Sequence, residues 1–242
     1  MCHGSCLASL PDGRLLCVWF GGSKEGAADT EIYSSLGTPV FRKRSLTPED
    51  VKGKGLYDGK GQIELDVTCQ WSDPVCLTQM PEACWNPVLL VYQNKVCLFF
   101  KTGDRIADWQ TFVMTSPTDP VYWSAPRELV PQDRNGGRGP VRTKPIILPS
   151  GRICAGGSVE RGDWQSFCDY SDDGGNTWQR TALLGLNLLA ENLPEAGNLL
   201  PEAQPDQTVL PPLSPQSFNG RGIIQPALWQ EANGRVHMYM RS

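Results

Sequence analysis

Apolar residues in this chain gather in short runs of strand length, arranged as hairpins around turns. Four runs directly follow turn residues and read LLCVWF (15–20), VCLFFK (96–101), ICAGGS (153–158) and VHMYMR (236–241). A second strand-like run precedes each turn, and it opens on a polar residue followed by Gly or Pro. Short strands at steady spacing with Gly- and Pro-containing turns predict an all-β protein.

The hairpins belong to a longer repeat that closes on tryptophan. Trp71-Ser72-Asp73-Pro74 and Trp123-Ser124-Ala125-Pro126 are near copies, and Trp178 takes the same place in the third unit. This repetition predicts a β-propeller, of which the chain holds three four-stranded units and the start of a fourth. A β-sandwich with accidental similarity is the alternative.

The repeat also predicts where the blades of the propeller begin and end. Their limits are about 1–74, 84–126 and 141–181, and a fourth blade starts over about 222–242. Insertions at 36–68 and 181–217 explain why the unit lengths differ. Because a propeller covers its edge strands by closing its ring, we expect this sequence to be the N-terminal part of a longer protein and to fold poorly alone.

The stretch SDDGGNTW at 171–178 has the chemistry of a tight turn. Asp173 can accept hydrogen bonds from backbone amides across the turn, and Gly175 can adopt a positive φ without a Cβ clash. Trp178 is then expected to fill the gap between neighbouring blades. An ordinary Asp/Gly hairpin is the alternative, since short motifs are weak evidence.

Composition narrows the classes of function. The chain has 242 residues, a net charge of −4 and no basic run, which argues against a general nucleic-acid binder. No apolar stretch is long enough to predict a membrane span. The two histidines show no paired ligand spacing, so no metal site is predicted.

The nine cysteines bear on the compartment. Their number is odd, no C-x-x-C pair occurs, and several lie among apolar strand residues. This pattern favours buried, reduced thiols and a reducing, cytoplasmic compartment, without fixing the localisation. In an exported protein, Cys69 and Cys76 could instead bridge a loop.

The repeat predicts a binding pocket. The polar residues that open the first strand of each unit are His3, Asn86, Lys144 and Gln225, and the residues seven positions after each turn are Phe20, Lys101, Ser158 and Arg241. We expect these positions to meet around the propeller axis. Lys101, Lys144 and Arg241, with Arg142 near them, would suit an anionic ligand such as a carboxylate. The alternative is that these residues simply end strands in solvent.

A Gly-rich loop after the second strand offers candidate proton donors. The loop, 21–29, carries Glu25 and Asp29. Partial desolvation would raise the pKa of either carboxyl group and fit it for general acid catalysis. A solvated acidic loop is the alternative. Such chemistry needs no cofactor and no metal.

These segments resemble the sialidase (neuraminidase) superfamily, in its BNR/Asp-box, exo-α-sialidase-like branch. The resemblance covers nearly the whole chain and is carried by CHGSCLASLPDGRLLCVWFGGSKEG, CWNPVLL, RTKPI, SDDGGNTW and QPALWQEANGRVHMYMRS. SDDGGNTW looks like an Asp box, the turn between the outer strands of a blade. The resemblance implies a six-bladed β-propeller, of which this chain covers about the first three and a half blades. It also implies an exo-glycosidase that hydrolyses a terminal acidic sugar, such as sialic acid, from glycoconjugates.

The resemblance also implies roles for individual residues. Arg241 matches the second of three arginines that grip the substrate carboxylate, and Glu25 falls close to the acid/base residue. His3 stands where the first arginine would lie, and Gln225 where a Glu assists the Tyr nucleophile. The third arginine and the Tyr would lie beyond residue 242. Since His and Gln replace charged groups, these positions indicate a divergent branch.

Two other functions stay open. A non-catalytic propeller that binds glycans or a protein partner would explain the replaced residues. A polysaccharide lyase would also use basic residues against a uronate carboxylate. The oligomeric state is not predicted.

Overall fold

The computed structural model describes residues 1–45, 63–117, 122–185 and 222–241. Within them the chain forms antiparallel sheets and one short 3-10 helix, η1 (Ile106–Asp108), which confirms the all-β prediction. The first sheet contains β1 (Cys2–Ser9), β2 (Leu15–Gly21), β3 (Glu31–Ser45), β4 (Ile63–Trp71) and β5 (Val75–Cys76). The second contains β6 (Cys84–Tyr92), β7 (Lys95–Thr102), β8 (Gln110–Pro117) and β9 (Arg127–Glu128).

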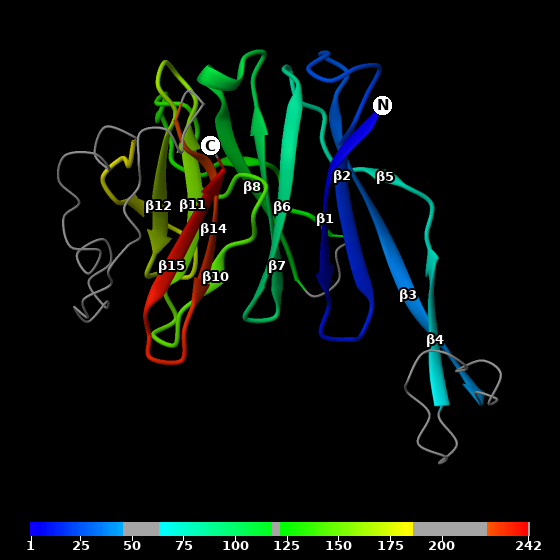
Figure 1. Ribbon diagram of the computed structural model, residues 1–242. Helices are drawn as coiled ribbons and strands as arrows, with labels where there is room; N and C mark the ends of the chain where they lie inside the picture. Colours follow the sequence, from blue (N-terminus) through cyan, green and yellow to red (C-terminus); the bar gives the residue numbers. More distant parts are fainter. Residues whose placement is uncertain (46–62, 118–121, 186–221, 242) are drawn as a thin grey trace, which may run out of the picture.

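The third sheet contains β10 (Ile146–Ile147), β11 (Ile153–Val159), β12 (Gln165–Ser171) and β13 (Gln179–Arg180). The fourth is the hairpin of β14 (Ile224–Gln230) and β15 (Val236–Arg241). Each sheet follows chain order, except that β5 pairs with β3 in the first sheet, and the sheets lie side by side (Figure 1). Sequential hairpins of this kind are what the repeated apolar runs predict.

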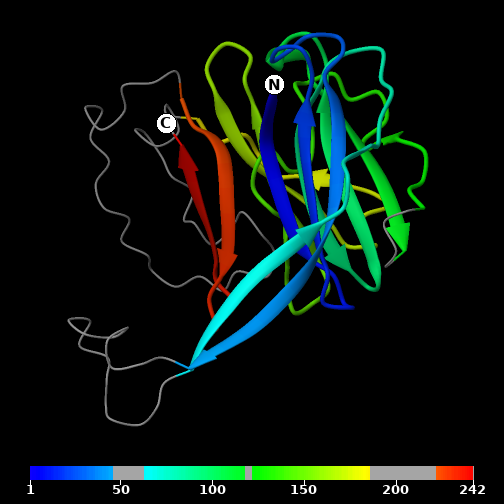
Figure 2. The ribbon, with the colours of Figure 1, turned by 90° about the vertical axis from the view of Figure 1, so that its right-hand side faces the viewer.

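The predicted insertions are partly regular structure. β3 and β4 stay paired from Gly37 and Trp71 to Ser45 and Ile63, so 36–45 and 63–68 are strands. This two-stranded ribbon extends away from the other sheets (Figure 2). Three segments lie outside the described residues. They are 46–62 in the first predicted insertion, 118–121 in the second predicted blade and 186–221, which includes most of the second insertion.

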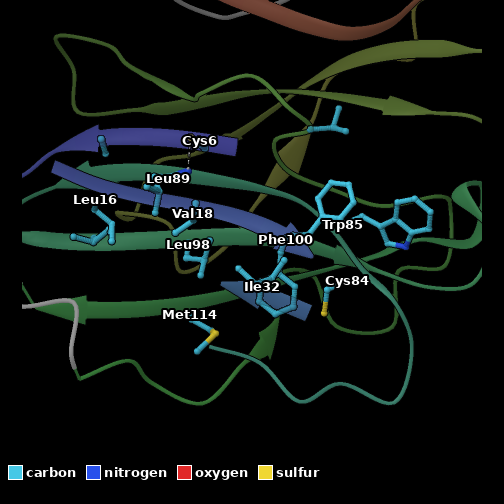
Figure 3. Close-up of a cluster of buried hydrophobic side chains, with 14 of the residues drawn as sticks. Cys6, Leu16, Val18, Ile32, Cys84, Trp85, Leu89, Leu98, Phe100 and Met114 are labelled. Carbon is cyan, nitrogen blue, oxygen red and sulfur yellow. Dashed lines mark hydrogen bonds between the residues drawn. The ribbon is translucent and has the colours of Figure 1, made fainter. Parts of the chain in front are cut away.

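Neighbouring sheets pack face to face through apolar side chains. Between the first and second sheets, the core includes Leu16, Val18 and Phe20 of β2 and Leu89 and Leu98 of the second sheet (Figure 3). Further buried clusters join the second sheet to the third and the third to the fourth. This serial packing positions the ends of the strands relative to one another.

The turn at 171–178 has the hydrogen bonds that its sequence predicts. The Asp173 carboxylate accepts bonds from the Thr177 amide at 2.9 Å and the Thr177 hydroxyl at 2.6 Å, and these bonds lower its pKa. Gly175 has a φ of 91°. Trp178 is 7% exposed and packs edge-on against Phe99 of the second sheet, so it fills the space between two sheets as expected.

A positive φ marks the same position in all four sheets. The backbone amides of Leu10, Leu148 and Glu231 donate equivalent turn hydrogen bonds, and the residues six positions before them are Gly4, Arg142 and Gln225. These residues and Asn86 have φ values of 43° to 62°. Register shifts occur at this point in the first, second and fourth sheets.

This register corrects the sequence alignment. In the third sheet the counterpart of Asn86 and Gln225 is Arg142, and Lys144 lies two residues further on. In the first sheet the counterpart is Gly4, one residue after His3. The sequence aligns the four units by the Pro or Gly that follows each polar residue. The structure aligns them by a backbone kink, which no residue type indicates.

No disulfide joins any of the nine cysteines, all of which lie in the described residues. Five of them are buried. Cys69 and Cys76 therefore form no loop bridge. Within the described ranges, no helix is long and apolar enough to cross a membrane.

Candidate functional site

The predicted site residues lie at one end of their sheets. Pairing joins His3 to Phe20, Trp85 to Lys101 and Ile224 to Arg241, so the start of each first strand lies beside the end of the second. Both labelled chain ends lie at this end (Figure 1). The loops that follow β2, β7 and β11 leave their sheets here as well.

His3 and Glu25 are brought together. Nδ1 of His3 lies 3.6 Å from Oε1 of Glu25, with about half of each side chain exposed. The loop that carries Glu25 rests on the second sheet, because a Cβ at Gly26 would lie only 3.0 Å from the ring of Trp85. Trp85 is held in turn by a 2.9 Å hydrogen bond from its indole nitrogen to the Gly103 carbonyl.

Asp29 does not have the environment expected of a proton donor. Its carboxylate accepts hydrogen bonds from the Ser23 hydroxyl at 2.8 Å and the Ser23 amide at 3.0 Å. The Ser23 hydroxyl is the main cause that lowers the pKa of Asp29, whereas a general acid needs a raised pKa. Asp29 therefore closes the loop that presents Glu25.

Lys101 is buried rather than open to a ligand. It is 3% exposed, and its ammonium group donates hydrogen bonds to the Thr111 hydroxyl at 2.8 Å and the Arg138 carbonyl at 2.5 Å. Burial lowers its pKa to about 7. Arg138 pairs with the fully buried Asp169, with 2.7 Å between Nη2 and Oδ1. The lysine thus belongs to a buried polar network under the loop at 136–139.

The other predicted basic residues are exposed. Nη1 of Arg241 donates a 3.4 Å hydrogen bond to Oε1 of Gln225. Lys144 donates to the Leu7 carbonyl and so links the third sheet to the first. Arg142 is exposed, and Asn86 is buried at 8% exposure. The contacts of the described residues do not join the His3–Glu25 pair to the Gln225–Arg241 pair.

Sequence reasoning missed Glu160, which follows β11. Its carboxylate accepts a 3.4 Å hydrogen bond from the Ser158 hydroxyl. Burial raises its pKa, while Ser158, Arg241 and Lys101 act in the opposite direction. The repeat holds a signal that marks this residue. Two residues after Phe20 and Lys101 the first two units have glycines, 22 and 103, whereas the third unit has Glu160 two residues after Ser158.

A cavity of about 310 Å³ lies beside the loop that follows β7. Its walls include Gly103, Asp104, Arg105, Arg134 and Arg161. None of the predicted site residues lines this cavity. Arg161 donates a 2.8 Å hydrogen bond to Asp108 in the same wall, so part of its charge is already paired.

The described residues hold no group of three or more His, Cys, Asp or Glu side chains placed to bind a metal ion. The residues of the candidate site carry carboxyl groups, basic side chains and amides. These groups can exchange protons and bind an anion.

Four antiparallel sheets packed in series define a propeller-like protein. The family model of a BNR repeat-like domain matches residues 13–242, and the chain belongs to this family. A comparison with curated protein sequences gave no significant match.

The chain is similar to several solved structures at low identity, and those with TM-scores of 0.60 and 0.50 share its fold. A protein of unknown function from Dyadobacter fermentans DSM 18053 is 12% identical, with a TM-score of 0.60, and the match covers 99% of this chain and 62% of that one. A mutant Trypanosoma rangeli sialidase that displays trans-sialidase activity is 12% identical, with a TM-score of 0.50, covering 99% of this chain and 34% of that one. A family 117 glycoside hydrolase from Zobellia galactanivorans is 13% identical, with a TM-score of 0.48, covering 76% and 58%. The chain thus spans less than two thirds of each of these proteins.

Proposed function

We propose that this protein is an exo-glycosidase that hydrolyses a terminal acidic sugar, sialic acid or a related one, from glycoconjugates. Its sheets are blades of a six-bladed propeller of sialidase type, and the turn at 171–178 is an Asp box. The observation that supports this proposal best is that two pairs of side chains, Glu25 beside His3 and Arg241 beside Gln225, lie at the same end of their sheets. A proton donor and a carboxylate ligand are the two elements that such a reaction needs.

Each side chain has a role in this proposal. Arg241 binds the carboxylate of the sugar, and its bond to Gln225 orients the guanidinium group. His3 and the exposed Lys144 and Arg142 add positive charge or hydrogen-bond donors. Asn86 and Gln225 bind sugar hydroxyls.

Glu25 is the general acid. As the glycosidic C–O bond breaks, the electron pair goes to the leaving oxygen, which takes the proton of Glu25. Water supplies the hydroxyl group that replaces the leaving group at the anomeric carbon. Asp29 holds the loop of Glu25, and Lys101 holds the neighbouring strand ends from beneath.

A Glu25→Gln variant tests the proposal. Loss of the proton donor should lower kcat by about 10²- to 10⁴-fold, whereas binding of the free acidic sugar should survive. Asp163→Asn, which removes an exposed carboxyl group from another loop at 160–164, is the control and should keep full turnover. Equal turnover in Glu25→Gln and the parent protein would refute the role of Glu25.

The second candidate is a non-catalytic propeller that binds glycans or proteins. The cavity of about 310 Å³ favours it, because its arginine-containing walls lie apart from Glu25 and Arg241. Under this function, acidic glycans bind without turnover, and Arg134→Ala weakens binding while Arg241→Ala does not.

A further inference from the structure

We propose that the cavity beside the loop that follows β7 binds a neutral sugar, the one to which the terminal acidic sugar of the substrate is attached. This inference rests on the proposed glycosidase function and adds a second sugar site to it. The cavity has a volume of about 310 Å³. Ligand pockets in proteins measure about 300 to 1,000 Å³, so this volume suits a small ligand such as one sugar unit rather than a long chain.

The charges of the cavity wall balance. Three of the eight residues that line it are arginines and three are acidic, which leaves no excess of either sign. Asp108 forms ion pairs with two of these arginines, Arg105 and Arg161. The third, Arg134, pairs with Glu128. A cleft attracts a charged ligand strongly when its walls carry one sign of charge, so this wall fits an uncharged ligand better than a second acidic sugar.

Two carboxyl groups of the wall are open to a ligand. Glu82 and Asp104 are exposed, and among the residues that the structure describes no hydrogen bond or ion pair joins either carboxyl group to another group. Carboxylate oxygens accept hydrogen bonds, the guanidinium groups and the Gln110 amide beside them can donate, and a sugar hydroxyl can do both. None of the eight lining residues is aromatic, so the cavity offers hydrogen bonds to hydroxyl groups rather than a ring for stacking.

The walls of the cavity are held in place by their own contacts. The Arg161 guanidinium group donates hydrogen bonds to Oδ1 of Asp108 at 2.8 Å and to the Ala107 carbonyl at 3.2 Å. It also donates to the Arg134 carbonyl at 3.5 Å, and so it joins three segments that are separate in the sequence. A wall that is ordered in this way lowers the cost of binding, because fewer groups become fixed when the ligand arrives.

The cavity lies next to the loop that carries Glu25, although Glu25 itself does not line it. A Cβ at Gly26 would lie 3.0 Å from the ring of Trp85. The indole nitrogen of Trp85 donates a 2.9 Å hydrogen bond to the carbonyl of Gly103, which lines the cavity. One indole group therefore separates the Glu25 loop from the cavity wall. Since Glu25 protonates the leaving oxygen in the proposed reaction, the sugar of the leaving group has to lie on the side of Glu25, while Arg241 binds the terminal sugar.

Two substrates with the same acidic sugar test this site in the full chain. Sialyllactose carries a neutral sugar at the cleaved bond, whereas an aryl α-sialoside carries only an aromatic leaving group. Asp104→Ala and Glu82→Ala each remove one open carboxylate. The ratio of kcat/KM for sialyllactose to kcat/KM for the aryl sialoside should fall about tenfold in each variant, because a charge-assisted hydrogen bond to a hydroxyl group of the neutral sugar is lost.

Asp163→Ala is the matched control, since it removes an exposed carboxyl group that does not line the cavity, and it should keep the parent ratio. If both cavity variants also keep the parent ratio, the inference is overturned and the glycosidase function stands. If folded parent protein hydrolyses neither substrate, the proposed activity on sialosides fails, and calorimetry of intact sialyllactose decides the inference. An affinity that Asp104→Ala leaves unchanged overturns the sugar site, whereas a loss of affinity confined to the cavity variants supports it.

Discussion

Replacing Lys101 with methionine should change how stability depends on pH. Lys101 is 3% exposed, and its pKa falls from an ordinary 10.5 to about 7 because burial disfavours the charged ammonium group. Between these two values the unfolded chain binds a proton that the folded protein has released. The free energy of unfolding contributed by this residue therefore rises with pH across that interval and is lowest below about pH 7.

The size of the effect follows from the two pKa values. Each pH unit within the interval is worth about 1.4 kcal/mol. Between about pH 6 and about pH 9, the parent protein should gain about 2.5 kcal/mol relative to Lys101→Met. The methionine keeps most of the buried side-chain volume, and the Thr111 hydroxyl still donates to the Arg138 carbonyl, so the variant should fold.

Urea unfolding of both proteins at a series of pH values measures this difference directly. Lys95→Met, at the opposite end of β7, is the matched control for removing a lysine from this strand. Parallel pH profiles for the parent and Lys101→Met would refute the reasoning. We expect the free energy of unfolding of Lys101→Met to rise relative to that of the parent protein as the pH falls.

Three further substitutions test the packing that positions the site. Arg138→Leu strands the buried carboxylate of Asp169 and should cost about 3 to 5 kcal/mol in urea unfolding, with the double change to Leu at both positions costing less than the sum of the single ones. Trp178→Ala empties the space between the second and third sheets and should cost about 3 to 5 kcal/mol, so an unchanged melting temperature would contradict its packing role. Gly156→Ala places a Cβ against the Pro226 carbonyl and should cost about 1 to 3 kcal/mol by parting the third and fourth sheets, whereas Gly185→Ala, whose Cβ would meet first the end of the Gln165 side chain at 3.3 Å, is the comparison for close contact with backbone.

The sequence predicts the strands well because its signals are local. Apolar runs around Gly-Arg turns identify the hairpins, and the Asp173 turn forms the bonds that its residues allow. Lys101 and Arg241, each seven residues after its turn, pair with Trp85 and Ile224, which directly precede the positive-φ residues of the first strands. Hairpin register is set by turn length, which can be counted in a sequence.

Side-chain surroundings could not be predicted in the same way. The positive φ at Arg142 moves the repeat position by two residues from Lys144, and no residue type signals that kink. Lys101 looks like a ligand-binding residue in sequence, yet the loop at 136–139, distant in the chain, buries it. The surroundings of Glu160 could not be predicted either, since the charges that lower its pKa belong to Arg241 and Lys101 of other sheets.

The most direct test of the proposed function is hydrolysis of a panel of fluorogenic α-sialosides and related acidic glycosides, with Arg241→Ala measured alongside. The account predicts that the parent protein releases the fluorophore and that Arg241→Ala raises KM by about tenfold or more, since a charge-assisted bond to the sugar carboxylate is lost. Absence of release by folded parent protein, or release that is unchanged in Arg241→Ala, would contradict it.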